Sequence, residues 1–273
     1  MSTRHIVVLC EGPHDVSFLR SVLKANGCIP LKKVIKDLDA PWNAFFLKRL
    51  QQRNTDSAQF KSQDAIIHDE TPTLVAGMMT ADEKRVWYFL ACVGDSQNTS
   101  VPFLKTLLAN CAPNLPPEHR LANLGVVIVN DADRIGIDER LKDIKNRYGE
   151  VVMMILPEFD GVPANGVIRG AEFGAGTCIF AKPGVGLGTL EDIIFPMLQE
   201  ANPSVMEDAT EFINKHPTAK PAKKLKAIIT VAGQPENPGF ALSVILRDNP
   251  YLKDEVLKAS PLCQQYLKVL MDV

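Results

Sequence analysis

Residues 5–12 read HIVVLCEG, an unbroken apolar run that ends in an acid and a glycine. A short run rich in β-branched side chains, closed by Gly12 and Pro13, has the length of a buried strand and not of a helix. Apolar side chains then recur at helical spacing between Val16 and Leu23, and Gly27 follows as a C-terminal stop. The sequence therefore predicts a strand, a tight turn and a helix.

The same pattern recurs twice further along the chain. GVVIVN, ending at Asn130, is followed by an acidic turn and a helix expected to end at Gly149, and a strand over 86–94 is followed by a helix over 101–110. Strands that are continuously apolar and alternate with amphipathic helices are typical of a parallel sheet covered on both faces. The predicted fold class is α/β, with a Rossmann-like, mostly parallel sheet flanked by helices.

The chain divides into segments of different character. Residues 1–200 carry the α/β pattern, interrupted by 31–84, which we interpret as a largely helical insertion. The glycine-rich stretch 161–188 predicts short antiparallel strands, and Thr189 is a natural N-cap for a helix that Pro196 should kink. Residues 201–273 are expected to form a helical, Lys-rich C-terminal extension packed on the first domain.

Composition sets the outer limits on function. The 273 residues are 46% apolar and 23% charged with a net charge of −2, as in an ordinary globular protein and unlike one that coats nucleic acid through bulk charge. No apolar run approaches membrane-spanning length, and the six scattered cysteines form no metal-binding pair. We expect a cytoplasmic protein with reduced thiols and no membrane partner.

One stretch of the chain is strongly basic. Five lysines fall within twelve residues that contain no acid: Lys215, Lys220, Lys223, Lys224 and Lys226. The first interpretation is a solvated helix face, and the alternative is contact with phosphates beside a metal centre.

Acidic residues follow two of the predicted strands. Glu11 closes the first strand, and Asp131 and Asp133 follow another, so all three should meet where parallel strands end. In extended chain, residues two apart point to the same side and can reach one cation. Carboxylates suit a hard ion such as Mg²⁺. Without such an ion, two like charges about 4 Å apart repel by roughly 4 kcal/mol at an effective dielectric of about 20.

Each acid also has a purely structural interpretation. Those at positions 11 and 15 suit the first turn of a helix, Asp131 and Asp133 suit a turn and an N-cap, and Glu191 and Asp192 lie where a helix dipole favours acids. Only the acid that closes the first strand is poorly explained by capping.

The joint pattern is more specific than its parts. EGPHD at 11–15, DAD at 131–133 and GTLED at 188–192 together resemble the motifs of the Toprim domain over roughly residues 5–200. The chain is most similar to the Toprim domains of overcoming-lysogenization-defect nucleases and to small stand-alone prokaryotic Toprim proteins.

The resemblance implies a one- or two-metal site that binds Mg²⁺, with Mn²⁺ as a substitute. Glu11, Asp131 and Asp133 would bind the first metal with Asp15 close by, and Glu191, with Asp192, would join a second. Two such ions activate water and stabilise the leaving oxygen of a phosphodiester. The turn Gly94-Asp95-Ser96-Gln97-Asn98 would border this site.

The related nucleases also imply an assisting lysine downstream of the acidic motifs. The nearest are Lys223, Lys224 and Lys226, of which Lys224 is our working assignment.

Other functions fit less well. The four tyrosines lie in no recognisable topoisomerase motif, and Gly184-x-Gly186-x-Gly188 lacks the GxGxxG spacing of a dinucleotide site. The chain has no GxxxxGK[ST] loop, so an ATPase or another protein partner would supply any energy coupling.

We therefore expect a Mg²⁺-dependent nuclease or related phosphoryl-transfer enzyme acting on nucleic acid, with DNA expected in preference to RNA. The alternative is a catalytically weak Toprim-fold metal-binding module within a larger nucleic-acid-processing or defence complex. A small-molecule phosphohydrolase or nucleotide-binding protein is the third hypothesis.

Overall fold

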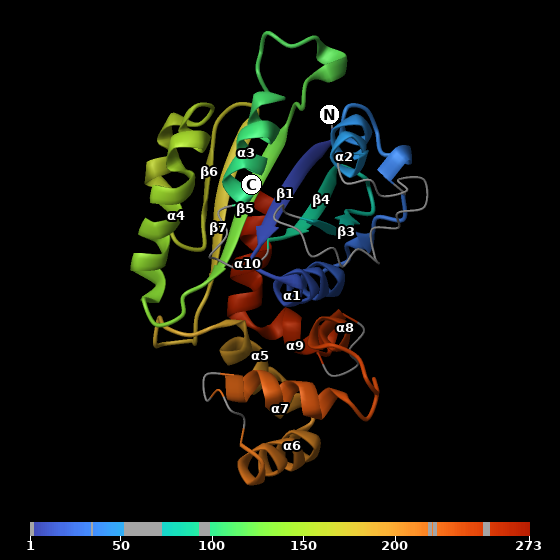
Figure 1. Cartoon of the computed structure of the whole chain (residues 1–273), viewed down its shortest axis with the longest axis vertical. Helices are drawn as coiled ribbons and strands as arrows, with labels where there is room; N and C mark the ends of the chain where they lie inside the picture. Colours follow the sequence, from blue (N-terminus) through green and yellow to red (C-terminus); the bar gives the residue numbers. More distant parts are fainter. Residues whose placement is uncertain are drawn as a thin grey trace.

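The computed structural model describes residues 3–33, 35–51, 73–92, 99–217, 220, 223–247 and 252–273 (Figure 1). The described strands form one seven-stranded sheet in the order β2-β3-β4-β1-β5-β7-β6. They are β1 (Arg4–Cys10), β2 (Ile29–Pro30), β3 (Thr73–Met79), β4 (Arg85–Ala91), β5 (Leu124–Asp131), β6 (Val167–Arg169) and β7 (Phe173–Phe180).

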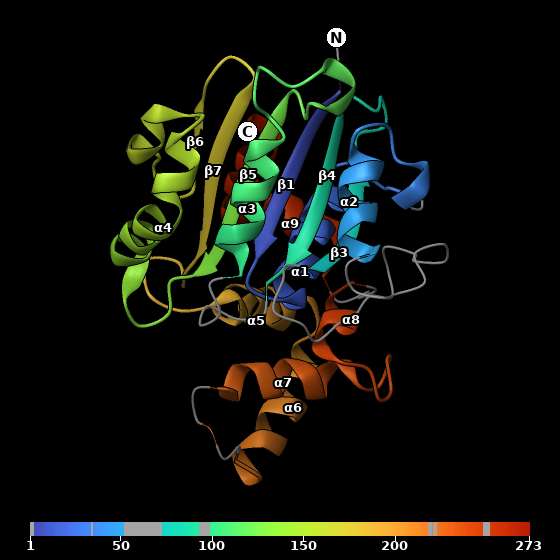
Figure 2. The same cartoon turned by 45° about the horizontal axis from the view of Figure 1, so that its top comes forward.

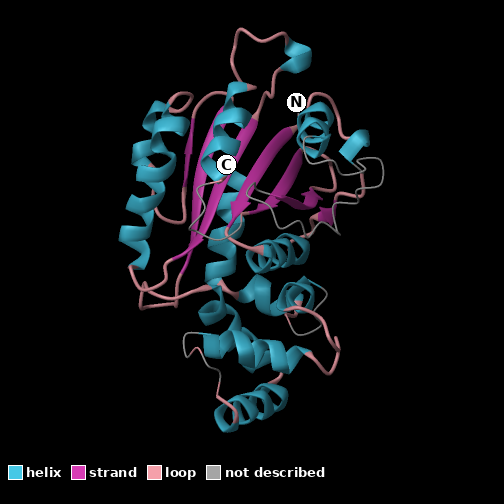
Figure 3. Cartoon of the chain, viewed as in Figure 1, coloured by secondary structure: helices cyan, strands magenta, loops and turns pink. Residues whose placement is uncertain are grey.

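Helices cover both faces of this sheet, as Figure 3 shows. They are α1 (Pro13–Ala25), α2 (Trp42–Gln51), α3 (Ser100–Ala109), α4 (Gly136–Met153), α5 (Leu190–Ala201), α6 (Pro203–Lys215), α7 (Lys224–Gly233), α8 (Leu242–Arg247), α9 (Asp254–Ala259) and α10 (Pro261–Asp272). Short 3₁₀ turns lie at Ile35–Asp37, Pro117–His119 and Pro157–Gly161.

The central strands are parallel, as the apolar runs predicted. β1 pairs in parallel with β4 and β5, and β5 pairs in parallel with β7. Because all four are buried on both faces, neither side shows the polar alternation of a half-exposed sheet. The predicted α/β class with a mostly parallel sheet is confirmed.

Alternate residues of β1 enter two separate cores. Ile6 and Val8 pack with α1 and the C-terminal helices, whereas Val7 and Leu9 pack with α3 and α4. In Figure 1, α3 and α4 lie in front of the sheet and α10 lies behind it. The first core also ties the last helix to the sheet, because Nε1 of Trp87 donates a 3.0 Å hydrogen bond to the carbonyl of Leu270.

Several local expectations need correction. The segment 31–84 is not simply a helical insertion, because β3 within it pairs antiparallel with β4 and extends the sheet. The helix expected to stop at Gly149 runs on to Met153, since a single glycine weakens a helix without ending it. Pro196 lies inside α5 and does not break the helix, which continues to Ala201.

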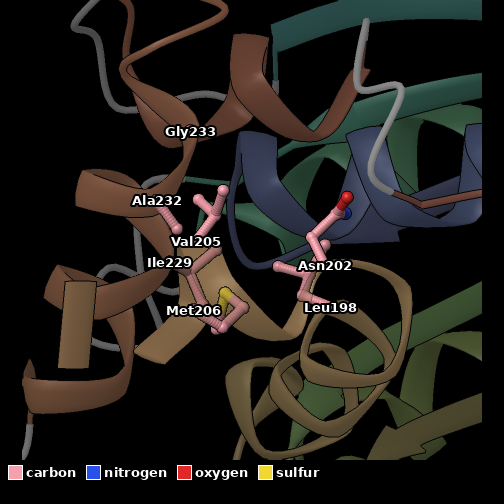
Figure 4. Close-up of a pocket in the computed structure, with 7 residues that line it drawn as sticks. All are labelled: Leu198, Asn202, Val205, Met206, Ile229, Ala232 and Gly233. Carbon is pink, nitrogen blue, oxygen red and sulfur yellow. The ribbon is translucent and has the colours of Figure 1, made fainter. Parts of the chain in front are cut away.

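Helices α6 and α7 extend past the end of the sheet (Figure 2), whereas α10 returns to pack on one face of the sheet. The described part of 201–273 is helical, and α8 and α9 pack against α1. Helices α5, α6 and α7 enclose a small hollow lined mainly by apolar side chains, among them Leu198, Met206 and Ile229 (Figure 4). This packing joins the outlying helix α6 to the rest of the protein.

Candidate functional site

Strands β1 and β5 lie side by side and end at the same edge of the sheet. Glu11 directly follows β1, and Asn130 and Asp131 end β5. The Nδ2 amide of Asn130 donates a 2.5 Å hydrogen bond to Oε1 of Glu11. The parallel pairing therefore brings together two polar groups that are far apart in the sequence, at the edge where helices α1 and α5 begin.

Asp15 is buried in the first turn of α1. Only 7% of the residue is exposed, and its Oδ2 accepts a 2.9 Å hydrogen bond from the main-chain N–H of Gly12. Burial raises the pKa of Asp15 to about 7, with a further rise from the charges of Glu11 and Glu191 and an opposing effect from the Gly12 hydrogen bond and Lys226. The capping interpretation is thus correct for Asp15, and the residue also belongs to a cluster of acids.

Asp131 lies at the centre of the same cluster. Its Oδ1 accepts a 2.8 Å hydrogen bond from the main-chain N–H of Leu190, the first residue of α5. Burial raises the pKa of Asp131 to about 9, and the charges of Asp15, Glu11 and Glu191 add to the rise. Buried Asp15 and half-buried Asp131 therefore lack enough nearby positive charge to stabilise their ionised forms.

The start of α5 supplies the next two acids. Oδ2 of Asp192 accepts a 2.9 Å hydrogen bond from the main-chain N–H of Thr189, the N-cap residue, so Asp192 serves the helix end. Gly188 has a φ of +113°, and a Cβ there would lie 2.7 Å from Oδ2 of Asp192, so this turn requires glycine. Glu191 is half-buried, and its charge raises the pKa of Asp15 and Asp131, which places it on the cluster side.

Asp133 does not share the geometry of Asp131. Its φ is +50°, so the extended backbone that would point both side chains the same way is not formed, and that expectation is wrong. A pair of main-chain hydrogen bonds to Gly188 holds this conformation, with N···O distances of 2.7 and 2.8 Å. The Asp133 carboxylate forms a 2.8 Å ion pair with the buried guanidinium of Arg140.

Lys226, and not Lys224, approaches the cluster. Its Nζ donates to Nδ1 of His14 over 3.2 Å, and its charge lowers the pKa of Asp15. Burial, and then the nearby Lys226 charge, lower the pKa of His14 to about 4, so the imidazole is neutral at physiological pH and accepts this hydrogen bond. Lys224 is exposed at the start of α7.

The donor chemistry fits a hard cation, because the cluster offers carboxylate oxygens and an excess of negative charge. The arrangement of the side chains does not itself define a coordination sphere. Within the ranges that the structure describes, no three His, Cys, Asp or Glu side chains are grouped closely enough to hold one ion. The predicted turn Gly94-Asp95-Ser96-Gln97-Asn98 lies outside the described residues.

Three contributors to the site were not foreseen from the sequence. Asn130 had a visible signal, since it is a polar residue at the end of a buried strand. His14 lies within the EGPHD motif, but its partner Lys226 is 212 positions away. Arg140 braces the turn after β5 by donating from Nε to the main-chain carbonyl of Asp131 over 2.7 Å, and its identity as a buried cation depends on tertiary packing.

No curated protein matches the chain. Similar in structure is the "hypothetical protein PH0156 from Pyrococcus horikoshii OT3", with 14% identity, 100% of this chain and 99% of that chain covered, and a TM-score of 0.49. Among the described helices, none combines the length and apolar character needed to cross a membrane.

A family model described as "Protein of unknown function (DUF3226)" matches residues 5–271, which include both the acidic cluster and the C-terminal helices. The chain therefore belongs to the DUF3226 family.

Proposed function

We propose that this protein is a Toprim-like, Mg²⁺-dependent nuclease or related phosphoryl-transfer enzyme whose acidic cluster acts on nucleic acid. The observation that carries the proposal is that buried Asp15 and half-buried Asp131 lie close enough to Glu11 and Glu191 for these charges to raise their pKa values. The charges of Glu11 and Glu191 raise the pKa of both aspartates, and the charge of Asp15 also raises the pKa of Asp131. A divalent cation would relieve this repulsion.

Glu11, Asp15 and Asp131 would hold the cation, with Glu191 as the further acid from α5. When bound, Mg²⁺ supplies Lewis-acid activation of a phosphodiester and of its attacking water. Asp133 takes a supporting part in this proposal, because Arg140 holds its carboxylate while fixing the carbonyl of Asp131. Mn²⁺ should replace Mg²⁺, since both accept oxygen ligands.

Lys226 is the cation best placed to meet a phosphate at this cluster. His14 accepts one of its three N–H groups, which orients the ammonium group and leaves two donors for other acceptors. We propose Lys226 in place of Lys224 as the assisting lysine. The substrate we favour is DNA in preference to RNA, met in the cytoplasm, and any energy coupling would come from an ATPase or another protein partner.

Cleavage of supercoiled plasmid and of single-stranded oligonucleotide in Mg²⁺ or Mn²⁺ tests the proposal. We expect metal-dependent cleavage that Glu11→Gln and Asp131→Asn each reduce at least a hundredfold. Glu139→Gln, an exposed acid on α4 with a 3.7 Å partner in Lys142, is the matched control and should retain activity. Absence of metal-dependent cleavage, or equal activity in all three variants, would contradict the enzyme.

The second candidate is a metal-binding module that is catalytically weak alone. The specific observation in its favour is that the sequence has no GxxxxGK[ST] loop and a net charge of only −2, which suit a module that depends on a partner. Calorimetric titration with Mn²⁺ separates the two. Binding that Asp131→Asn abolishes, together with no turnover on any polynucleotide, would support the module.

A further inference from the structure

A second concave site lies at the amino-terminal ends of the central strands, opposite the ends that carry the acidic cluster. A cavity of about 440 Å³ is enclosed by the C-terminal parts of α3 and α4 and by the first residues of β5 and β7. Leu124 and Phe173, which begin these two strands and pair in register, both line it. Asp131 ends the same strand β5, so the cavity and the acids lie a strand length apart.

The wall of the cavity is predominantly apolar. Ten of its fourteen lining residues are Leu, Ile, Val, Ala, Met, Phe or Pro. Burial raises the pKa of the Cys111 thiol, another lining group, to about 12, so it stays neutral. Of the remaining polar groups, Glu172 forms a 3.2 Å ion pair with Arg120, a residue outside the lining.

Several main-chain carbonyls at the helix ends around the cavity are already hydrogen-bonded within the protein. α3 ends at Ala109, and carbonyls near its end accept hydrogen bonds from residues that follow in the chain. The Leu108 carbonyl accepts from the Cys111 N–H over 2.9 Å, and the Thr106 carbonyl accepts from Nδ2 of Asn110 over 2.7 Å. At the end of α4, the Val152 carbonyl accepts from the Ile155 N–H over 3.0 Å. Carbonyls that are already bonded do not require a charged or strongly donating ligand.

Exposed methionine lies at the edge of this site. Met154 lines the cavity with 75% of its surface exposed, and the preceding Met153 is 39% exposed. Thioether side chains are flexible and adapt to apolar partners of different shapes. An apolar rim of this kind is stabilised when a ligand covers it.

We propose that this cavity binds a neutral, apolar small molecule. Its volume falls within the range of about 300–1,000 Å³ that is typical of ligand pockets, and its mostly apolar lining with a few polar groups is the usual composition of such sites. This second site is independent of the proposed nuclease chemistry, because the two share no lining residue.

Titration of the full chain with the neutral fluorescent probe N-phenyl-1-naphthylamine tests the proposal. We expect saturable, one-site binding. Ala109→Trp places a large side chain in the lining and should weaken probe binding at least tenfold. The matched control is Ala259→Trp, because Ala259 is also the exposed last residue of a helix, α9, and lies outside the lining.

Thermal unfolding establishes whether each variant is folded. If Ala109→Trp is not folded, Ala112→Phe fills the same cavity in its place. No saturable binding, or equal binding by the wild type and both filled variants, would overturn the proposal. Sedimentation supplies a further outcome. If the wild type forms a dimer that excludes the probe, and Ala109→Trp dissociates it, then the cavity is covered by a second copy and the small-molecule site is wrong.

Discussion

The main-chain N–H of Leu190 donates a 2.8 Å hydrogen bond to Oδ1 of Asp131, which joins the start of α5 to the end of β5. This contact holds a half-buried carboxyl group near other acids. An amide oxygen can accept the same hydrogen bond without carrying charge, so the electrostatic and structural roles of Asp131 can be separated by one substitution.

Asp131→Asn should change how stability depends on pH. The pKa of this carboxyl is raised to about 9 in the folded chain, against about 3.9 in an unfolded one. The folded chain therefore holds the proton more tightly, so the group's contribution to stability is full below about pH 4 and is lost as pH rises toward about 9. In EDTA, the free energy of unfolding of the Asp131→Asn variant should exceed that of the wild type by about 1–3 kcal/mol at about pH 8. Near pH 4 the two free energies should differ little. Urea unfolding measures this, and a parallel pH profile in the two proteins would contradict it.

Mg²⁺ should stabilise the wild type at neutral pH. A ligand at about one hundred times its Kd adds roughly 2.7 kcal/mol to the free energy of unfolding. Thermal unfolding with increasing Mg²⁺ measures the rise in Tm, which Glu11→Gln should abolish and Glu139→Gln should retain. An equal rise in all three proteins would mean that the ion binds elsewhere.

The two lysines can be distinguished by their effects on cleavage. Lys226→Met removes the ammonium group beside His14 and should lower kcat/KM at least tenfold, whereas Lys224→Met changes an exposed side chain and should leave it within about twofold. Metal-dependent turnover on one oligonucleotide provides the comparison. The opposite ranking would restore Lys224 as the assisting residue.

Arg140→Met should destabilise the turn between β5 and α4. The substitution removes the contacts of a buried guanidinium with Asp133, Asp143 and the carbonyl of Asp131, at an expected cost of about 2–4 kcal/mol. Lys142→Met on the same helix loses only an exposed pair and should cost under about 0.5 kcal/mol. Denaturant unfolding of both variants gives the comparison, and similar costs would show that Arg140 is not a brace.

Asp192→Ala should reduce stability more than metal affinity. Its carboxylate accepts from the Thr189 N–H, and loss of such a cap costs about 0.5–2 kcal/mol. Asp192→Asn keeps an acceptor and should recover most of the stability. Mn²⁺ titration of both variants would show affinities close to the wild type; a loss in both would make Asp192 a ligand.

The parallel core was predictable because strands buried on both faces leave continuous apolar runs, as in HIVVLC and GVVIV. The position of Glu11 beside the end of β5 followed from the same logic. Strand β3 also contains an apolar run, LVAGMM at 74–79, but the long polar sequence before it obscures this signal. By contrast, the left-handed backbone of Asp133 depends on its bridge to Gly188. The Lys226–His14 contact depends on how α7 docks, which no local pattern encodes.

The strand order also constrains how the chain folds. β1 lies at the centre of the sheet, yet its two neighbours begin at Arg85 and Leu124, and Trp87 makes its indole hydrogen bond to Leu270. Contacts between residues so distant in sequence raise the contact order and slow folding. While the chain is being synthesised, β1 must wait with both edges open, and it is in this interval that the protein is most exposed to aggregation and most dependent on chaperones.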